Sequence, residues 1–361
     1  MSRTPDTRTT CRLTHLSLIC CAAALLLVFI RFLEFDAPLT RFVRSLNEYQ
    51  IDYLHNPWLR ALSDTGDRFG RGESLLVVSA GLLLVGYTAR RATFKRAGWE
   101  TLLAHVVAGG VNTALKHLVG RGRPKFMHTD TSVFVPFGGK GWDSFPSGHS
   151  MAAFAIAAVL AVRFPRLRWL IMIMALAVSA SRLFRASHFL TDIVAGAVLG
   201  VLIGSIVAHP WNEWRLSFRR ALFTVMPPLA ALLAIMTTMA QSPSERGIAA
   251  LVSQGGLLLA FAALITYLFI TVRPAIEHAS LMRETTVALM GLGIATYSGS
   301  IWVAVVILLL CLAHWWHPER ELTEEPYASS SHAWPTEAGF GLAVLLTLFS
   351  MMELRGTFPI G

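Results

Sequence analysis

Long apolar segments recur along the whole chain, and they constrain its fold more than any other feature. A segment of this kind approaches the roughly 30 Å thickness of a membrane's hydrocarbon core. Lipid offers no hydrogen-bond partners to the backbone, so a spanning segment satisfies its own as a helix. We place ten spans near residues 15–33, 74–89, 98–118, 149–163, 168–184, 189–208, 221–240, 249–271, 286–313 and 338–354. The sequence therefore predicts an all-α fold, a polytopic bundle of membrane helices.

The composition agrees with a membrane protein. Hydrophobic residues make up 54% of the 361 residues and charged residues only 15%, whereas about a quarter of a soluble domain is charged. The mean hydropathy is +0.54. Two of the predicted spans are irregular: 149–163 is short, and 286–313 is interrupted by Tyr297–Ser300. The second is either one kinked helix or two short ones.

The charged residues orient the spans. Counted from a cytoplasmic N-terminus, the even-numbered connections are basic, and the last outward loop is acidic. This positive-inside pattern predicts a multi-pass protein of a bacterial inner (plasma) membrane, with a cytoplasmic N-terminus. The formal net charge of +9 is spread over these loops. It forms no continuous stripe for a phosphodiester backbone, so we expect no nucleic-acid partner.

Two outward connections are basic against this trend. They are the third connection, 119–148, and the short segment near 185–188. Topology alone predicts few positive charges on that side of the membrane, so we expect a functional reason for them. Together with the adjoining helix ends they contain Arg121, Arg123, Lys125, Lys140, Arg182 and Arg185.

Three short motifs occupy these outward positions. They are KHLVGRGRP from Lys116 to Pro124, PSGH from Pro146 to His149, and SRLFRASHFLTD from Ser181 to Asp192. Each is a weak signal alone. A cation at a helix end commonly extends toward lipid headgroups, and a histidine at a helix start is commonly a cap or a surface residue.

The three motifs together have the chemistry of phosphoryl transfer. Lys116, Arg123 and Arg182 supply three cations, two of them guanidinium groups that bind phosphate oxygens in pairs. The Gly148 amide lies at the predicted start of a helix, where the helix dipole favours an anion.

Two histidines complete the predicted site. His188 and Asp192 are four residues apart, so on a helix they share one face. Asp192 can then accept a hydrogen bond from one imidazole nitrogen and leave the other free to attack. His149 offers a second imidazole for proton transfer to the leaving oxygen.

The pattern Lys-x6-Arg-Pro, Pro-Ser-Gly-His and Ser-Arg-x5-His-x3-Asp resembles the signature of the type 2 phosphatidic acid phosphatase (PAP2) superfamily. The resemblance covers about residues 15–208 and implies a six-span core. It implies a phosphohistidine intermediate on His188, orientation by Asp192 and proton donation by His149. It also implies that phosphate is held, with no metal or other cofactor, by Lys116, Arg123, Ser147, Gly148 and Arg182. The sequence shows no dense Asp/Glu/His cluster with metal-ligand spacing.

Several neighbouring residues have weaker expectations. We expect His117 and Arg121 to face headgroups or to pack within the protein. Four residues are candidates for the mouth of the site: His128, Asp130, Lys140 and Asp143. The connection 34–73 contains either an amphipathic helix at the membrane interface or a loop that covers the bundle.

Two domains are expected. Residues 1–208 form the PAP2-like catalytic transmembrane domain. Residues 209–361 form a transmembrane extension of about four spans, to which the sequence assigns no role. The sequence predicts no oligomeric state.

The expected function is that of an integral-membrane enzyme that removes phosphate from a lipid phosphate or diphosphate on the periplasmic face. An outward site favours cell-envelope lipids, so a polyprenyl diphosphate or a lipid A phosphate is preferred over phosphatidic acid or phosphatidylglycerophosphate. The alternatives are a lipid phosphotransferase that uses the same site, a vanadate haloperoxidase and a non-catalytic lipid-binding protein. Ten apolar spans argue against the second, and the intact His149, His188 and Asp192 against the third.

Overall fold

The computed structural model describes residues 7–45, 57–126, 134–240, 248–272, 279–315 and 334–355. Within these ranges the chain forms twelve α-helices and three short 3-10 helices. The only strand-like pairing there is an isolated bridge between Arg121 and Phe134. The predicted all-α helical bundle is confirmed.

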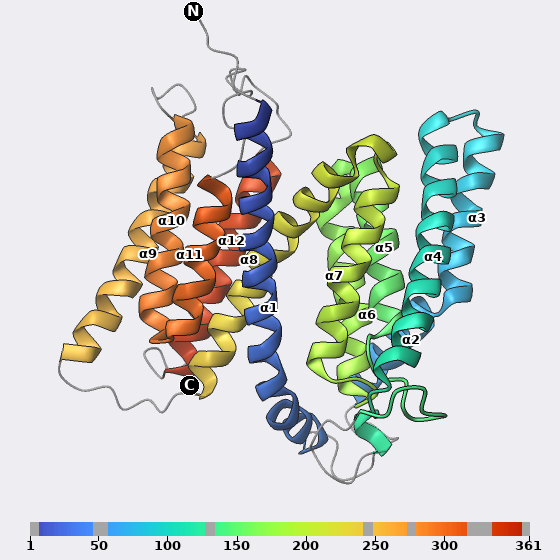
Figure 1. Cartoon of the computed structure of the whole chain (residues 1–361), viewed down its shortest axis with the longest axis horizontal. Helices are drawn as coiled ribbons and strands as arrows, with labels where there is room; N and C mark the ends of the chain where they lie inside the picture. The colour runs from blue at the N-terminus through green and yellow to red at the C-terminus, as the bar shows by residue number, and fades with distance from the viewer. Residues whose placement is uncertain are drawn as a thin grey trace, which may run out of the picture. The chain divides into compact units, whose positions relative to one another are not determined.

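All predicted apolar segments but 286–313 lie within a single helix, to within one residue, and the colours of Figure 1 follow these helices from the N-terminus in blue to the C-terminus in red. The interrupted segment 286–313 is two helices, because Gly299 takes a left-handed φ of 64° between them. The helices of this set are α1 (Thr7–Ser45), α3 (Gly72–Thr88), α4 (Ala92–Val119), α5 (Gly148–Arg163), α6 (Arg168–Phe184), α7 (Leu190–Val207), α8 (Trp214–Ala240), α9 (Ile248–Val272), α10 (Ala279–Ser298), α11 (Ile301–Trp315) and α12 (Trp334–Leu354).

Helix length separates these segments into two groups. Six described helices are long and apolar enough to cross a membrane, and a seventh span results if the bent pair Ser63–Gly70 and Gly72–Thr88 is one unit. Shorter apolar helices account for the rest of the ten predicted spans: Gly148–Arg163, Ile301–Trp315 and Gly339–Leu354. These three segments are apolar enough to be predicted as spans, although the helices they form are short.

One described helix lies outside the predicted spans. Helix α2 (Pro57–Gly70) falls in the mixed connection 34–73, one of the two structures expected there. The side chains of Trp58, Leu59 and Leu62 lie outside the described residues, so the expected contact with the membrane interface stays a prediction.

The chain divides into two compact units. Unit 1 comprises Met1–Arg31 and Met226–Gly361, and unit 2 comprises Phe32–Val225. The boundaries fall inside α1 and α8. Unit 2 contains all three motifs, and it extends beyond the domain boundary expected after residue 208. The assignment of catalysis to residues 1–208 stays a prediction.

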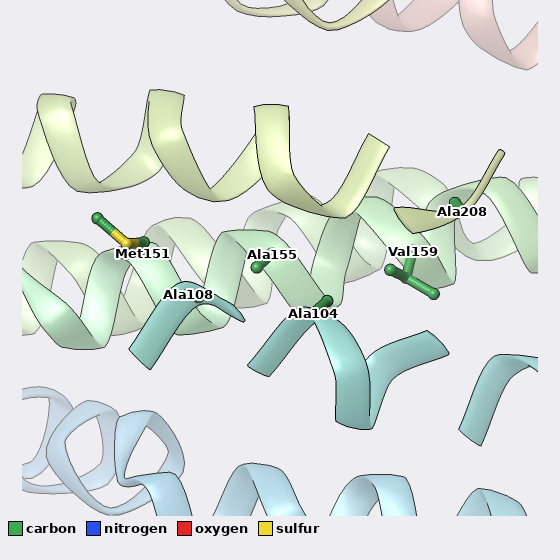
Figure 2. Close-up of a cluster of buried hydrophobic side chains, with 6 residues drawn as sticks. All are labelled: Ala104, Ala108, Met151, Ala155, Val159 and Ala208. Atoms are coloured by element: carbon green, nitrogen blue, oxygen red, sulfur yellow. The ribbon is translucent and has the colours of Figure 1, made fainter. Parts of the chain in front are cut away.

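Small side chains fill the core of unit 2. Figure 2 shows this cluster, in which α4 and α5 approach each other through alanines. Small residues at a helix interface let two backbones come close, which strengthens van der Waals packing in a membrane. The cluster consists of Ala104, Ala108, Met151, Ala155, Val159 and Ala208.

A glycine stripe on α7 packs directly against α5. Gly196, Gly200 and Gly204 follow one another at four-residue intervals, so they share one face. A Cβ on any of them would collide with a backbone carbonyl oxygen of α5 or of the residue before it. This contact brings the starts of α5 and α7 together, and the Ser147 amide donates to the Asp192 carbonyl oxygen at 2.9 Å. The second and third motifs therefore meet.

Candidate active site

The motif residues come together at one end of α4–α7. Lys116 lies in the last turn of α4 and Arg182 in the last turn of α6, whereas His149 lies in the first turn of α5. The connection from α4 to α5 lies at the lower end of unit 2 in Figure 1. His149 interacts electrostatically with Arg182, His188 and Lys116. Helices that alternate in direction therefore place residues from all three motifs in one cluster.

His188 is held in one tautomer by a backbone group. Its side chain is 4% exposed, and Nδ1 lies 2.8 Å from the Ser144 carbonyl oxygen. Because a carbonyl oxygen only accepts, Nδ1 carries the proton and Nε2 carries the lone pair. Burial lowers the pKa of His188, and this outweighs the nearby Asp192 carboxylate, which raises it. The imidazole is therefore neutral at neutral pH, as a nucleophile requires.

Asp192 lies close to His188, as the spacing predicts, but beyond hydrogen-bond distance. The closest approach, from Nδ1 to Oδ2, is 3.7 Å. Helix α7 begins at Leu190, so His188 precedes the helix and the rule for residues four apart does not apply. Asp192 Oδ2 instead accepts from Ser144 Oγ at 2.5 Å and from the Phe189 amide at 2.9 Å. Asp192 thus reaches His188 through Ser144.

Arg121 is buried deeply in the protein. It is 1% exposed, and Nη1 donates to Asp192 Oδ1 at 2.6 Å and to Thr191 Oγ1 at 2.5 Å. Its Nη2 donates to Asp36 Oδ2 of α1 at 2.7 Å. A buried guanidinium is tolerated when carboxylates and hydrogen bonds compensate its charge. The sequence analysis expected Arg121 to face headgroups or to pack within the protein, and it did not predict the hydrogen bond to Asp192.

The sequence feature that indicates this set of buried hydrogen bonds is Asp36, an acidic residue in α1. Asp36 is 2% exposed and accepts from the Thr191 amide at 3.0 Å. An ionisable residue inside a membrane helix is a functional candidate with a partner to be found. The predicted first span ends at residue 33, whereas α1 continues to Ser45, so the sequence prediction placed Asp36 outside the membrane helix.

Lys116 and Arg123 form one half of the cation cluster around Asp143. Arg123 Nε and Nη2 donate to the two Asp143 carboxylate oxygens at 2.8 and 2.6 Å, and Lys116 Nζ lies 3.8 Å from Oδ2. Burial alone would raise the pKa of Asp143, but the hydrogen bonds and charge of Arg123 hold it below its usual value. With a side chain 41% exposed, Asp143 lies at the edge of the site. Lys140 is exposed, and His128 and Asp130 lie outside the described residues.

Arg182 and His149 form the other half around Asp67 of α2. Arg182 Nη1 donates to Asp67 Oδ1 at 2.6 Å, and His149 Nε2 lies 3.4 Å from the same oxygen. Arg182 Nη2 and His149 Nε2 are buried and have no hydrogen-bond partner within the described part of the chain. Asp67 belongs to none of the motifs, and sequence analysis missed it.

Ser147 and Gly148 shape the turn before α5. The Ser147 side chain is fully buried and caps the helix by accepting from the Ser150 amide at 3.5 Å. Asn112 of α4 fastens the same turn, because its Nδ2 donates to the Pro146 carbonyl oxygen at 3.0 Å. A Cβ on Gly148 would lie 3.0 Å from Asn112 Oδ1. Glycine therefore permits this close approach, and Asn112 is a second residue that the motifs did not indicate.

The carboxylates of the site face cations. Within the described ranges no three His, Cys, Asp or Glu side chains are placed to hold a metal ion. Fixed ammonium and guanidinium groups beside two imidazoles suit an anion that gives up a phosphoryl group. Such a cluster at one end of a bundle of apolar helices is suited to phosphoryl transfer at a membrane.

Part of the chain is similar to known phosphatases. Residues 97–217 match the PAP2 superfamily. A lipid A 1-phosphatase from Rhizobium etli is 29% identical over 204 residues, which cover 54% of this chain and 84% of that protein. Phosphatidylglycerophosphatase B from Bacillus subtilis is 28% identical over 172 residues, 43% of this chain and 76% of the other. The residues that match the PAP2 superfamily, 97–217, include all three motifs.

One solved structure is also similar. It is a transmembrane PAP2-type phosphatidylglycerolphosphate phosphatase from Bacillus subtilis. Its sequence is 24% identical, and the match covers 55% of this chain and 94% of that chain. The TM-score is 0.35. A score of this size does not establish that the helices are arranged alike.

Proposed function

We propose that this chain is an integral-membrane lipid phosphatase that works through a phosphohistidine on His188. One observation carries the proposal: Lys116, Arg123 and Arg182 converge on the same end of the bundle as two imidazoles. At that point two buried nitrogens, Arg182 Nη2 and His149 Nε2, lack hydrogen-bond partners within the described residues. A buried donor without a partner costs about 1–3 kcal/mol, and phosphate oxygens would satisfy both.

The arrangement supports a two-step reaction. Neutral His188 Nε2 attacks phosphorus, the P–N bond forms, and the P–O bond to the lipid breaks. His149 gives its proton to the departing oxygen, so the lipid leaves as an alcohol, or as a monophosphate from a diphosphate. The three cations stabilise the equatorial oxygens. Water then attacks the phosphohistidine, His149 accepts its proton, and inorganic phosphate leaves while Nε2 regains its lone pair.

The proposed substrate is a cell-envelope lipid, either a lipid A phosphate or a polyprenyl diphosphate. The positive-inside pattern supports an inner-membrane protein with its N-terminus in the cytoplasm and its site on the periplasmic face. Similarity to a lipid A 1-phosphatase over 84% of that protein supports lipid A 1-phosphate as the first compound to test.

Phosphate release by the purified full chain tests this function. The panel consists of lipid A, undecaprenyl diphosphate, phosphatidic acid and phosphatidylglycerophosphate, each with and without EDTA. We expect release from at least one lipid, unchanged by EDTA. His188→Ala should reduce it by about 10³-fold or more, because only the binding groups remain.

His117→Ala is the matched control, since His117 is an exposed residue on α4 beside Lys116. It should retain wild-type turnover. Near-full activity of His188→Ala would contradict the assigned nucleophile, and a requirement for a divalent metal would contradict the metal-free mechanism.

A further inference from the structure

Asp67 approaches the two groups on the leaving-group side of the site, Arg182 and His149. We propose that Asp67 is a positioning residue that acts through His149, holding its imidazolium form ready to protonate the leaving oxygen. This role rests on the proposed function, in which His149 is the acid.

The Asp67 carboxylate is fixed from both sides. Oδ2 lies 3.0 Å from Arg71 Nη2 and 3.2 Å from Arg185 Nη1. Oδ1 faces the site, 2.6 Å from Arg182 Nη1 and 3.4 Å from His149 Nε2. The side chain is 14% exposed. A carboxylate gripped in this way presents Oδ1 to His149 in one orientation, and little entropy is lost when it acts.

Two glycines let α2 come close enough. A Cβ on Gly66 would collide with the Ser181 side chain, and one on Gly70 would lie 2.6 Å from His149 Cδ2. The backbone of α2 therefore lies directly against the residue before Arg182 and against the His149 ring. Asp67 sits between these two contacts in sequence, which places its carboxylate beside both groups.

The charges around His149 give Asp67 its role. The groups that interact with the imidazole are Arg182 of α6, Lys116 of α4, His188 before α7, and Asp67 of α2. Three of these four are cations or become cations when protonated, and such neighbours oppose a charged imidazole. A carboxylate favours the charged form. Asp67 is therefore the group in this set that favours the imidazolium, the form that donates a proton.

A simpler role would be to balance the charge of Arg182. That role and the proposed one differ in what the loss of the carboxylate does. If Asp67 only offsets Arg182, its removal strengthens anion binding and affects all leaving groups alike. If Asp67 supports the acid, its removal harms only those substrates whose leaving oxygen needs a proton.

The experiment compares two substrates in the full chain. Dioctanoyl phosphatidic acid has an alcohol leaving group that needs protonation, whereas p-nitrophenyl phosphate releases a stable anion. We expect Asp67→Asn to lower kcat/KM by about tenfold to a hundredfold for the lipid and by less than about threefold for the aryl ester. With the lipid, the basic limb of the pH profile should move to lower pH. Asp67→Glu should recover part of the loss.

Two further variants make the test specific. Asp64→Asn is the control, because Asp64 lies on the same helix and contacts Arg60 and Arg185; it should behave as wild type. The double variant His149→Ala/Asp67→Asn should be no slower with the lipid than His149→Ala, because two residues that act as one unit do not add.

Three outcomes would overturn the role of Asp67 and leave the proposed function intact. The first is an equal loss of kcat/KM for both substrates, and the second is additive losses in the double variant. The third is tighter inhibition of Asp67→Asn by vanadate with no dependence on the leaving group. Failure of the wild type to release phosphate from any substrate, or full activity of His188→Ala, would overturn the proposed function and the role of Asp67 with it.

Discussion

Each end of the α4–α7 bundle holds an arginine paired with a carboxylate. The two pairs differ in whether every buried nitrogen of the guanidinium group has a hydrogen-bond partner. At the end away from the motifs, Arg163 Nε and Nη2 donate to both Glu100 oxygens at 2.6 Å, and Nη2 also donates to the Ala208 carbonyl oxygen. This pair ties α5 to α4 and to the end of α7. At the other end, Arg182 donates to Asp67 with Nη1 and leaves the buried Nη2 without a hydrogen bond in the described residues.

The difference distinguishes a structural ion pair from a binding group. In the described residues no buried donor of Arg163 lacks a partner, so this pair serves to hold helices together. Arg182 keeps one buried donor without a partner there, which a ligand can satisfy. Position on the helix does not distinguish Arg163 from Arg182, since both lie in the last turn of an apolar helix; only the third motif sets Arg182 apart.

The largest expected effect comes from removing each arginine in turn. Arg182→Ala should lower kcat/KM for the lipid by about 10²- to 10³-fold, because it removes one donor to the transition-state oxygens. Arg163→Ala should leave kcat/KM within about threefold and instead destabilise the bundle by about 3 kcal/mol, because Glu100 stays partly buried without its main partner. Steady-state kinetics and thermal unfolding in detergent measure the two effects.

Arg182→Ala should also weaken inhibition by vanadate, whereas Arg163→Ala should not. The comparison fails if the two variants lose activity and stability to the same extent, because both arginines would then serve the same purpose.

A smaller effect is expected from Arg121, a buried arginine at the site end that donates hydrogen bonds to Asp192 and Asp36 within the protein. Arg121→Lys keeps the charge but loses the fork that joins Asp36, Thr191 and Asp192. We expect kcat to fall by about tenfold with KM nearly unchanged, since Asp192 would be less well fixed and the phosphate contacts would remain. A rise in KM without a change in kcat would show instead that Arg121 contacts the substrate.

The sequence predicted the helices and the cluster of motif residues for physical reasons. Lipid forces an apolar segment to be helical, and alternating helices return Lys116, His149, Arg182 and His188 to the same end. The small residues of α4, α5 and α7 pack closely in the structure, but the sequence did not predict which faces of these helices meet.

The sequence did not predict the partners of these residues. Arg121 is separated from Asp36 by 85 positions and Arg182 from Asp67 by 115. Such contacts depend on how each helix is rotated about its axis, and an apolar segment hydrophobic on all sides does not fix that rotation. His188 and Asp192 lie 3.7 Å apart, farther than the expected hydrogen bond, because the helix begins two residues after His188.

The smallest expected effect concerns pH and tests whether burial at the site end serves the nucleophile. His188 must be neutral to attack, and its pKa is lowered from 6.5, chiefly by burial. Activity is therefore lost as pH falls through a value below 6.5. Asp192→Asn removes a carboxylate that raises this pKa, so the acidic limb should move to still lower pH although kcat falls. An acidic limb above 6.5, or one that Asp192→Asn shifts upward, would mean that another group controls it.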